Sequence, residues 1–246
     1  MSPRFYAPAA NATGDRIVLP VDEAEHLTRV LRLTTGKPIR AFNGRGAEFD
    51  ALVSAIDRDG VHVQIGDRVA AAPEPRVAVT LAQAVLKGDK MDDVVRDAVM
   101  IGVAAIQPIV TERTEVSMAT LARSRRRERW ERIAISSAKQ CGRAIVPPIL
   151  EPTLFPLNDA AGVTVPSPVL VLVEPGASSG MALSELDLSV PQQATLVVGP
   201  EGGWTPEEVQ AMTKVGPLVM LGGRTLRADA MALVALAALF TRWREF

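Results

Sequence analysis

The most informative segment of the chain is LVVGPEGGWTPEE at residues 196–208. It opens with an apolar run, which is typical of a strand buried on both faces of a parallel sheet, and continues into a glycine-rich turn. Thr205 and Pro206 then supply the N-cap and first-turn proline of a helix. Ligands of open α/β sheets bind where strands end, and glycine lets the backbone approach them closely. The pattern predicts a ligand site at residues 199–203; the alternative is a simple tight turn.

A second glycine turn, LGGRTLR at residues 221–227, follows another apolar run. Two such loops can line one cleft for a flat heteroaromatic group. Neither loop has the spacing of a phosphate loop or of a dinucleotide-binding fingerprint, so a nicotinamide site is not indicated. The helix expected at residues 228–244 is almost entirely Ala, Leu, Val and Met, so it is buried on most faces, within its own chain or in a dimer interface.

Outward from these loops, apolar runs and helical patterns alternate along the chain. This alternation is typical of an α/β domain with a mostly parallel sheet. The helical patterns cover residues 90–101 and about 121–141. The expected strands are residues 77–83, 104–110, 169–173, 194–198 and 218–221.

The first 70 residues have a different texture, with short alternating runs separated by turn residues. Asn43-Gly44 and Asp59-Gly60 predict hairpins, and a helical piece is expected at residues 22–33. This pattern favours a small β-barrel. Residues 70–75 contain two prolines and no periodicity, as a linker does. We therefore expect one domain at residues 1–72 and a second at 73–246.

Composition excludes several classes of protein. The 246 residues are 48% hydrophobic and 22% charged, which is ordinary for a globular chain and excludes intrinsic disorder. A single cysteine, Cys141, allows no internal disulfide, and two histidines far apart in the sequence, His26 and His62, argue against a structural zinc site. The longest apolar run, residues 230–240, is too short for a bilayer span. We expect no membrane, no metal and a cytoplasmic location.

Charge is distributed unevenly although the formal net charge is only −1. Residues 111–143 hold nine basic and four acidic side chains, a balance of 9 − 4 = +5, whereas residues 144–201 hold six acids and no Lys or Arg. Such asymmetry is expected when one face of a protein meets a polyanion. The alternative is a solvated helix face.

An ordered set of short motifs runs over nearly the whole chain: RFY at 4–6, HL at 26–27, VLR at 30–32, KGDKMD at 87–92, GV at 102–103, AKQCGR at 138–143, GPEGG at 199–203, LG at 221–222 and LR at 226–227. This ordered set resembles the SPOUT-class 16S ribosomal RNA (uracil-N3)-methyltransferases. Two positions depart from that family: Met100 stands where it usually has Glu, and ADAM at residues 228–231 stands where Thr-Glu-Thr-Ala is common.

The resemblance implies a PUA-like β-barrel followed by a SPOUT domain, whose mostly parallel sheet is tied in a trefoil knot. It also implies a homodimer that binds S-adenosylmethionine in the knot and acts on 16S ribosomal RNA of the small subunit. The positions that match the family's cofactor neighbours are Gly199, Glu201, Gly202, Leu221, Gly222, Leu226 and Arg227.

The implied reaction suggests catalytic candidates. Uracil N3 carries a proton and is a poor nucleophile until that proton leaves, so a cation near O2 or O4 would stabilise the developing imide anion. Arg143 and Arg227 are the candidate cations. Glu201 and Asp229 are candidate bases, although a structural role at a helix N-terminus is the alternative for each carboxylate.

RNA contacts are expected on the basic segment and on the barrel. Basic side chains there would bind phosphates, which gives affinity without sequence information. Phe5 and Tyr6 could stack on a base, but a core position is the better interpretation. Lys139, Gln140 and Arg143 are expected on one helix face. The candidate RNA-binding residues are Arg4, Arg29, Arg32, Arg125, Arg126, Lys139, Gln140 and Arg143.

Two other functions remain compatible with this sequence. One is a non-catalytic RNA-binding or ribosome-assembly factor on the same fold, which the departures at residues 100 and 228–231 favour. The other is a SPOUT methyltransferase that acts on transfer RNA ribose. Cofactor binding without methyl transfer would support the first, and transfer to a 2′-hydroxyl would support the second.

Overall fold

The computed structural model describes residues 2–157, 165–176, 180–186 and 189–245. The chain forms two compact units, and each is described by itself. The first unit contains Met1–Glu74 together with Ile135–Val146, and the second contains Pro75–Ala134 and Pro147–Phe246. Residues 135–146 therefore belong with the N-terminal unit, although they lie far from it in the sequence.

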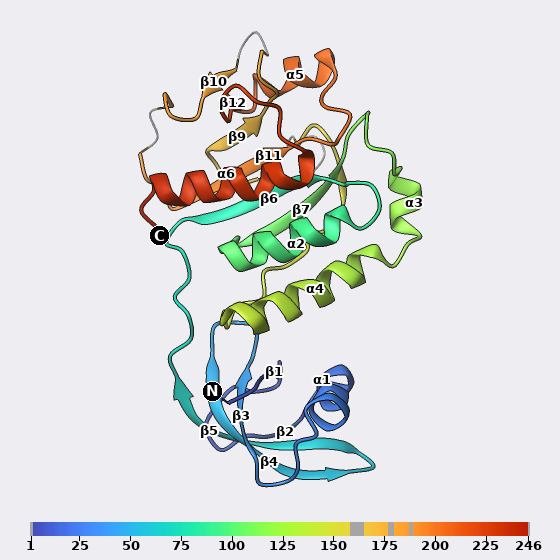
Figure 1. Cartoon of the computed structure of the whole chain (residues 1–246), viewed down its shortest axis with the longest axis vertical. Coiled ribbons are helices and arrows are strands. Elements are labelled where there is room, and N and C mark those ends of the chain that lie inside the picture. The colour runs from blue at the N-terminus through green and yellow to red at the C-terminus, as the bar shows by residue number, and fades with distance from the viewer. Residues whose placement is uncertain (1, 158–164, 177–179, 187–188, 246) are drawn as a thin grey trace. The chain divides into compact units, whose positions relative to one another are not determined.

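The first unit is built on a five-stranded sheet in the order β1-β3-β4-β5-β2 (Figure 1). The pairs β3–β4, β4–β5 and β2–β5 are antiparallel, and β1 pairs with β3 in parallel. The turns at Asn43-Gly44 and Asp59-Gly60 join β3 to β4 and β4 to β5, as the sequence predicts. The strands are β1 (Arg4–Tyr6), β2 (Arg16–Val18), β3 (Pro38–Phe42), β4 (Glu48–Asp57) and β5 (Gly60–Val69).

Alternate residues along the strands form the hydrophobic core of this unit. Val61, Val63 and Ile65 of β5 point into it, and Phe5 of β1 is fully buried there. A core position for Phe5 is thus confirmed, whereas Tyr6 is only half-buried. The helical piece expected at residues 22–33 is shorter than predicted: α1 (Val21–Glu25) continues into a single π-helical segment, η1 (His26–Val30).

The second unit is built on a sheet of seven described strands in the order β10-β12-β9-β11-β6-β7-β8, and the pairs are parallel. The α/β class with a parallel sheet is therefore confirmed. The strands are β6 (Ala78–Ala84), β7 (Ala105–Val110), β8 (Thr153–Leu154), β9 (Val169–Leu172), β10 (Met181–Ala182), β11 (Gln193–Val198) and β12 (Leu218–Met220).

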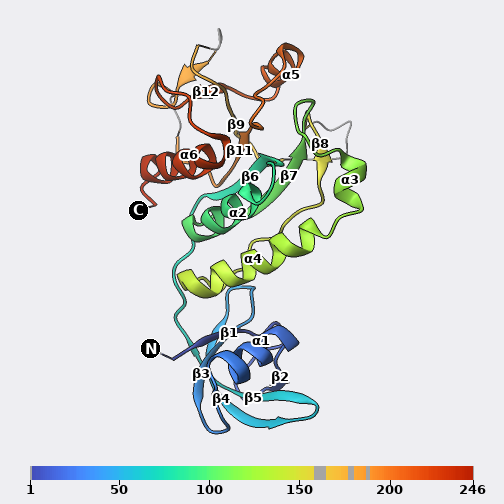
Figure 2. The ribbon, with the colours of Figure 1, turned by 45° about the vertical axis from the view of Figure 1, so that its right-hand side comes forward.

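Helices cover this sheet. The helices α2 (Lys90–Ile101) and α6 (Ala228–Arg242) pack against each other beside the sheet (Figures 1 and 2). Met212, the last residue of α5 (Pro206–Met212), is buried in a cluster with Val171 of β9 and Val197 of β11. Among the described residues no helix is long and apolar enough to cross a membrane.

The long helix expected at about residues 121–141 is interrupted. It is replaced by α3 (Met118–Ala122) and α4 (Arg126–Cys141). Between them, the Ser124 hydroxyl donates to the Leu121 carbonyl at 2.8 Å and accepts from the Arg126 N–H at 3.4 Å. Serine side chains compete for backbone groups in this way and interrupt helices. The prediction of one continuous helix was wrong.

The end of α4 also differs from the expectation. The helix ends at Cys141, and Gly142 has a φ of +90°, a left-handed conformation that commonly terminates helices. Arg143 therefore lies beyond the helix. The prediction that it shares a helix face with Lys139 and Gln140 was wrong, because a glycine one residue past the last turn redirects the chain.

Candidate functional site

A cavity of about 290 Å³ opens at the carboxyl edge of the parallel sheet, within the second unit. Its walls come from segments that follow β9, β11 and β12 and from the first turn of α2. Ligands of open α/β sheets bind at this edge. The lining residues are Lys90, Leu172, Val173, Glu174, Val198, Gly199, Pro200, Glu201, Gly203, Trp204, Thr225, Leu226, Arg227, Ala228, Asp229 and Met231.

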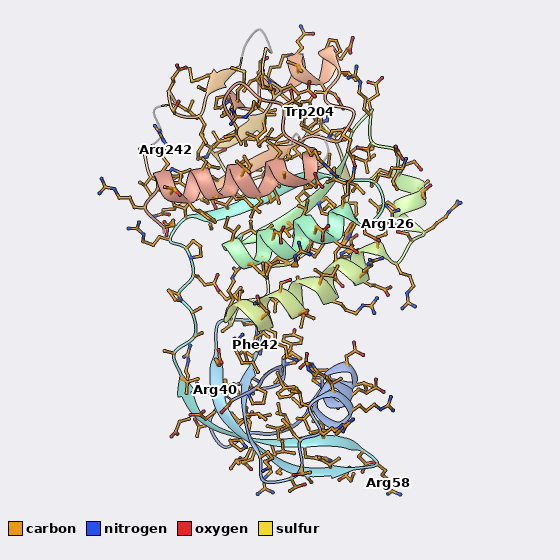
Figure 3. The ribbon with its side chains drawn as sticks, viewed as in Figure 1. Arg40, Phe42, Arg58, Arg126, Trp204 and Arg242 are labelled. Carbon is orange, nitrogen blue, oxygen red and sulfur yellow. The ribbon has the colours of Figure 1, made fainter. Side chains whose placement is uncertain are left out.

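The first glycine loop, residues 199–203, is shaped by the indole of Trp204 (labelled in Figure 3). A Cβ at Gly199 would lie 2.8 Å from Trp204 Cε2, so only glycine allows this approach. The indole Nε1 donates to the Leu172 carbonyl at 2.8 Å, and thus ties the end of the loop to β9. The sequence signal for a glycine loop therefore has a physical cause at Gly199.

The helix after this loop begins as the sequence predicts. The Thr205 hydroxyl accepts from the Glu208 N–H at 3.2 Å, and Glu208 Oε2 accepts from the Thr205 N–H at 2.9 Å. This is a complete capping box with Pro206 in the first turn. The other carboxylate oxygen of Glu208 accepts from the Glu112 N–H at 3.0 Å, so the buried Glu208 also joins α5 to the segment after β7.

Two more contacts hold residues 199–203 in place. Glu201 Oε1 accepts from Lys90 Nζ at 2.8 Å and from the Lys87 N–H at 3.3 Å. Arg113 Nη1 donates to the Gly202 carbonyl at 3.0 Å. Side chains and backbone groups from the segments after β6 and β7 thus fix the loop before any ligand binds.

These contacts also determine the acidity of Glu201. Partial burial raises the pKa of Glu201, but the hydrogen bond from Lys90 and those from the N–H groups of Glu201 and Lys87 lower it more. The pKa of this carboxyl therefore lies below its usual range. A carboxylate that is harder to protonate is a weaker proton acceptor.

The second glycine loop, residues 221–227, is less restrained. Among the described residues, no hydrogen bond joins residues 221–226 to another segment. Gly222 has a φ of +68°, and a Cβ built on it or on Gly223 would meet no atom within 4 Å. Arg227 is the N-cap residue of α6 and pairs with Asp229 at 3.2 Å, and its side chain is 74% exposed.

Comparison with known families fits this geometry. A model described as an RNA methyltransferase domain matches residues 73–240, and one described as an RNA methyltransferase PUA domain matches residues 19–66. The chain belongs to this RNA methyltransferase family. The family and the fold class inferred from the sequence are thereby confirmed.

Individual relatives of this RNA methyltransferase cover most of its chain. The Synechocystis protein named ribosomal RNA small subunit methyltransferase E is 33% identical over 225 residues, which is 90% of this chain and 71% of the relative. The Neisseria gonorrhoeae protein of the same name, whose crystal structure contains S-adenosyl methionine, is 32% identical with a TM-score of 0.85, covering 99% of this chain and 98% of that one. A Legionella pneumophila structure with bound cofactor SAM is 28% identical with a TM-score of 0.88, and covers 98% of each chain.

The methyltransferase brings most of the expected cofactor residues to one place. Gly199, Glu201, Leu226 and Arg227 line the cavity, together with Asp229, which was predicted as a candidate base. Gly202, Leu221 and Gly222 belong to the same two loops but are outside the lining. Among the lining residues with polar side-chain groups, reasoning from the sequence missed Lys90, Glu174, Trp204 and Thr225. Lys90 lies within the quoted KGDKMD motif, and Trp204 lies within the stretch at residues 196–208.

Arg143 lies elsewhere, in the first unit. Its side chain is buried, and its Nε lies 3.0 Å from Glu74 Oε2. Its carbonyl accepts from Arg4, whose guanidinium also binds Glu48 at 2.9 Å and the carbonyls of Ala138 and Lys139. These contacts join residues 135–146 to the barrel.

Lys139 is also engaged within the first unit. Its Nζ lies 2.7 Å from Glu23 and 3.0 Å from His26 Nδ1, over the ring of Phe5. The other candidate RNA-binding residues differ in exposure: the side chains of Arg29 and Arg125 are 76% and 86% exposed, Arg32 and Gln140 are exposed, and Arg126 is half-buried.

Proposed function

We propose that this protein transfers the methyl group of S-adenosylmethionine to N3 of a uridine in 16S ribosomal RNA of the small subunit, and that it does so as a cytoplasmic homodimer. The observation that carries the proposal is the cavity at the carboxyl edge of the sheet, which both glycine loops line. The relatives' names and the S-adenosyl methionine in the Neisseria structure support the reaction and its cofactor.

The lining suits S-adenosylmethionine. Leu172, Val198 and Leu226 offer apolar surface to a purine, and the two glycine loops offer backbone groups to its edge. Glu174 and Asp229 supply carboxylates that would bind the ribose hydroxyls and the positively charged groups of the cofactor. The volume of about 290 Å³ is near the lower end, about 300 Å³, of ordinary ligand pockets. These residues would hold the cofactor.

When bound, S-adenosylmethionine supplies a methyl group already activated by its sulfonium, so the chain has to position the base and handle one proton. Arg227 lines the cavity and is a candidate to stabilise negative charge on the uracil. Glu201 has a lowered pKa, which disfavours it as the base. Asp229 remains a candidate base, although it also accepts from the Ala230 N–H at the start of α6.

Phosphate contacts are proposed for the exposed part of the basic set. Arg29, Arg32, Arg125 and Gln140 are exposed to solvent. Arg29 and Arg125 pair with Glu25 and Glu128, but these ion pairs are exposed and weak, so RNA phosphates can compete for both arginines. Arg4, Lys139 and Arg143 are engaged by Glu48, Glu23 and Glu74. We assign these three cations to the folding of the first unit, with Arg126 at the margin of the phosphate-binding set.

The homodimer is proposed to use α6. Leu233 and Val234 lie on this helix with 37% and 43% of their surface exposed. Neighbouring exposed apolar residues on a largely apolar helix are typical of a surface covered by a second subunit.

The test is transfer of a tritiated methyl group from S-adenosylmethionine to small ribosomal subunits that lack the modification, followed by nucleoside analysis. We expect 3-methyluridine from the native protein and from the control Leu154→Trp, which alters an exposed residue of β8 outside the cavity. Leu226→Trp, which adds an indole to the lining, should lose the product.

Other outcomes would favour the alternatives. Cofactor binding by calorimetry without any transfer would favour the RNA-binding assembly factor. Label in a 2′-O-methylated nucleoside would favour the transfer RNA ribose methyltransferase, with transfer RNA as the substrate to try next.

A further inference from the structure

Lys90 is a cation of the cavity that neither glycine loop provides. It is the first residue of α2, lines the cavity together with Gly199 and Leu226, and has 35% of its side chain exposed. Its Nζ lies 2.8 Å from Glu201 Oε1. The segment after β6 thus places an ammonium group beside the loop expected to hold the cofactor.

This ammonium group has donors to spare. A lysine Nζ carries three N–H donors, and among the described residues Glu201 is its hydrogen-bond partner. Two donors therefore remain for a ligand in the cavity. The ion pair with Glu201 fixes the position of Nζ and leaves its other N–H donors available.

The other candidate cations are placed less favourably. Arg227 lines the same cavity, but 74% of its side chain is exposed and its Nη2 pairs with Asp229. Arg143 is buried in the first unit, where Glu74 binds its guanidinium. Lys90 is half as exposed as Arg227, so water screens its charge less.

We propose that Lys90 is a further catalytic residue of the methyl transfer, which donates a hydrogen bond to a uracil carbonyl oxygen next to N3 and stabilises the imide anion. The proposal rests on the function proposed above. It makes the substrate class specific: a base whose nucleophilic nitrogen lies beside a carbonyl that can carry negative charge.

Uracil N3 loses its proton to water or hydroxide of the solvent, and the negative charge spreads to the neighbouring carbonyl oxygens. N3 then forms a bond to the methyl carbon while the bond from that carbon to sulfur breaks, and the sulfur keeps the electron pair. Lys90 keeps its proton throughout and contributes charge and hydrogen bonds.

Glu201 fits this arrangement as a positioning residue. Its pKa lies below the usual range, because the contacts from Lys90 and two backbone N–H groups outweigh the effect of burial, so it stays ionised at neutral pH. An ionised Glu201 holds Lys90 in place. The other charged groups on the cavity wall are Glu174, Arg227 and Asp229.

The experiment compares Lys90→Met and Lys90→Arg with Lys214→Met. Lys214 is an exposed lysine of the same unit that lies outside the cavity. Each variant is assayed on small subunits for kcat, for KM of S-adenosylmethionine and for the dependence of kcat on pH. Cofactor affinity is measured separately by calorimetry without RNA, and thermal unfolding checks that each variant is folded.

We expect Lys90→Met to lower kcat about 100-fold, as the loss of one donor to a developing oxyanion does. Cofactor affinity should fall much less than kcat, because Lys87 and Arg113 still hold residues 199–203. Its rising pH limb should move to higher pH, because N3 then loses its proton without help. Lys90→Arg should retain most of the activity, since it keeps the charge, and Lys214→Met should match the native protein.

Three results would overturn the proposal. If Lys90→Met transfers methyl groups at the native rate, Lys90 has no catalytic role, although the proposed function stands. If the loss appears entirely as weaker cofactor binding, Lys90 acts on the cofactor loop. If the native protein forms no 3-methyluridine, the proposed function and this inference fall together.

Discussion

The two glycine loops line the same cavity but are held very differently. Residues 199–203 are fixed by Trp204, by Lys90 and Lys87 through Glu201, and by Arg113 through the Gly202 carbonyl. Residues 221–226 make no hydrogen bond to another segment among the described residues. One wall of the cavity is preformed, and the other can adapt to a ligand.

The two loops require glycine for different physical reasons. Gly199 is required because a neighbouring ring occupies the space of a Cβ. Gly222 is required because its φ is positive, although the space around it is open. A glycine-rich stretch in a sequence does not distinguish a crowded site from a left-handed turn, and the two respond differently to substitution.

The largest effect is expected at the crowded position. Gly199→Val puts carbon atoms within 2.8 Å of the Trp204 ring, so the loop has to move. Overpacking of this kind costs about 1–3 kcal/mol of unfolding free energy, and the displaced wall should abolish cofactor binding. Denaturant unfolding and calorimetry with S-adenosylmethionine measure the two losses. Native behaviour in both would show that the loop is not preformed.

The next largest effect is expected at Glu208, which caps α5 directly after the preformed loop. Glu208→Ala removes the carboxylate half of the capping box and the acceptor of the Glu112 N–H, and should cost about 1–2 kcal/mol of unfolding free energy. The matched control is Glu207→Ala, an exposed neighbour in the same turn, which should change stability by less than about 0.5 kcal/mol. Equal losses in urea titrations would contradict the supporting role of Glu208.

The adaptable loop offers a matched pair of substitutions. Gly222→Ala forces an alanine into a left-handed conformation and should cost about 1 kcal/mol. Gly223→Ala has the same open surroundings without a positive φ, so its effect should stay within about 0.5 kcal/mol. Thermal unfolding of the two variants compares them directly. A larger loss at residue 223 would mean that contacts, and not backbone conformation, restrain this loop.

The smallest effect is the pH dependence from Glu201. Because the pKa of Glu201 is lowered in the folded protein, its ionised form stabilises the fold at a pH above the ordinary glutamate value of about 4.3. This contribution is lost as the pH falls through the lowered value. The difference in unfolding free energy between the native protein and Glu201→Gln should therefore shrink from pH 7 to pH 3. If this difference in unfolding free energy grew toward acid pH, the pKa of Glu201 would be raised in the folded protein and not lowered.

Local signals made much of the second unit predictable. Apolar runs such as residues 194–198 identified the parallel strands, and Thr205 with Pro206 identified the start of α5, because both depend on neighbours in sequence. The break in the helix at Ser124 was missed, since a serine also occurs inside helices and its presence alone does not show that its hydroxyl binds the backbone. The trefoil knot was inferred only from the resemblance, as no local pattern encodes a chain crossing.

Long-range pairing is what the sequence could not reveal. Lys90 and Glu201 lie 111 residues apart, so their ion pair follows from the sheet order and not from any motif. The basic residues near the end of α4 also form ion pairs with residues that are distant in the sequence. Lys139 and Arg143 counted toward a charge excess, yet Glu23 and Glu74, distant in the sequence, bind them. Charge counted along a chain does not measure the charge left for RNA.

The most direct test of the difference between the two loops is amide hydrogen exchange, followed by mass spectrometry with and without S-adenosylmethionine. We predict fast exchange at residues 221–226 in the free protein, strong protection there on binding, and little change at residues 199–203. Equal protection of both loops on binding, or a larger change at residues 199–203, would contradict a preformed wall facing an adaptable one.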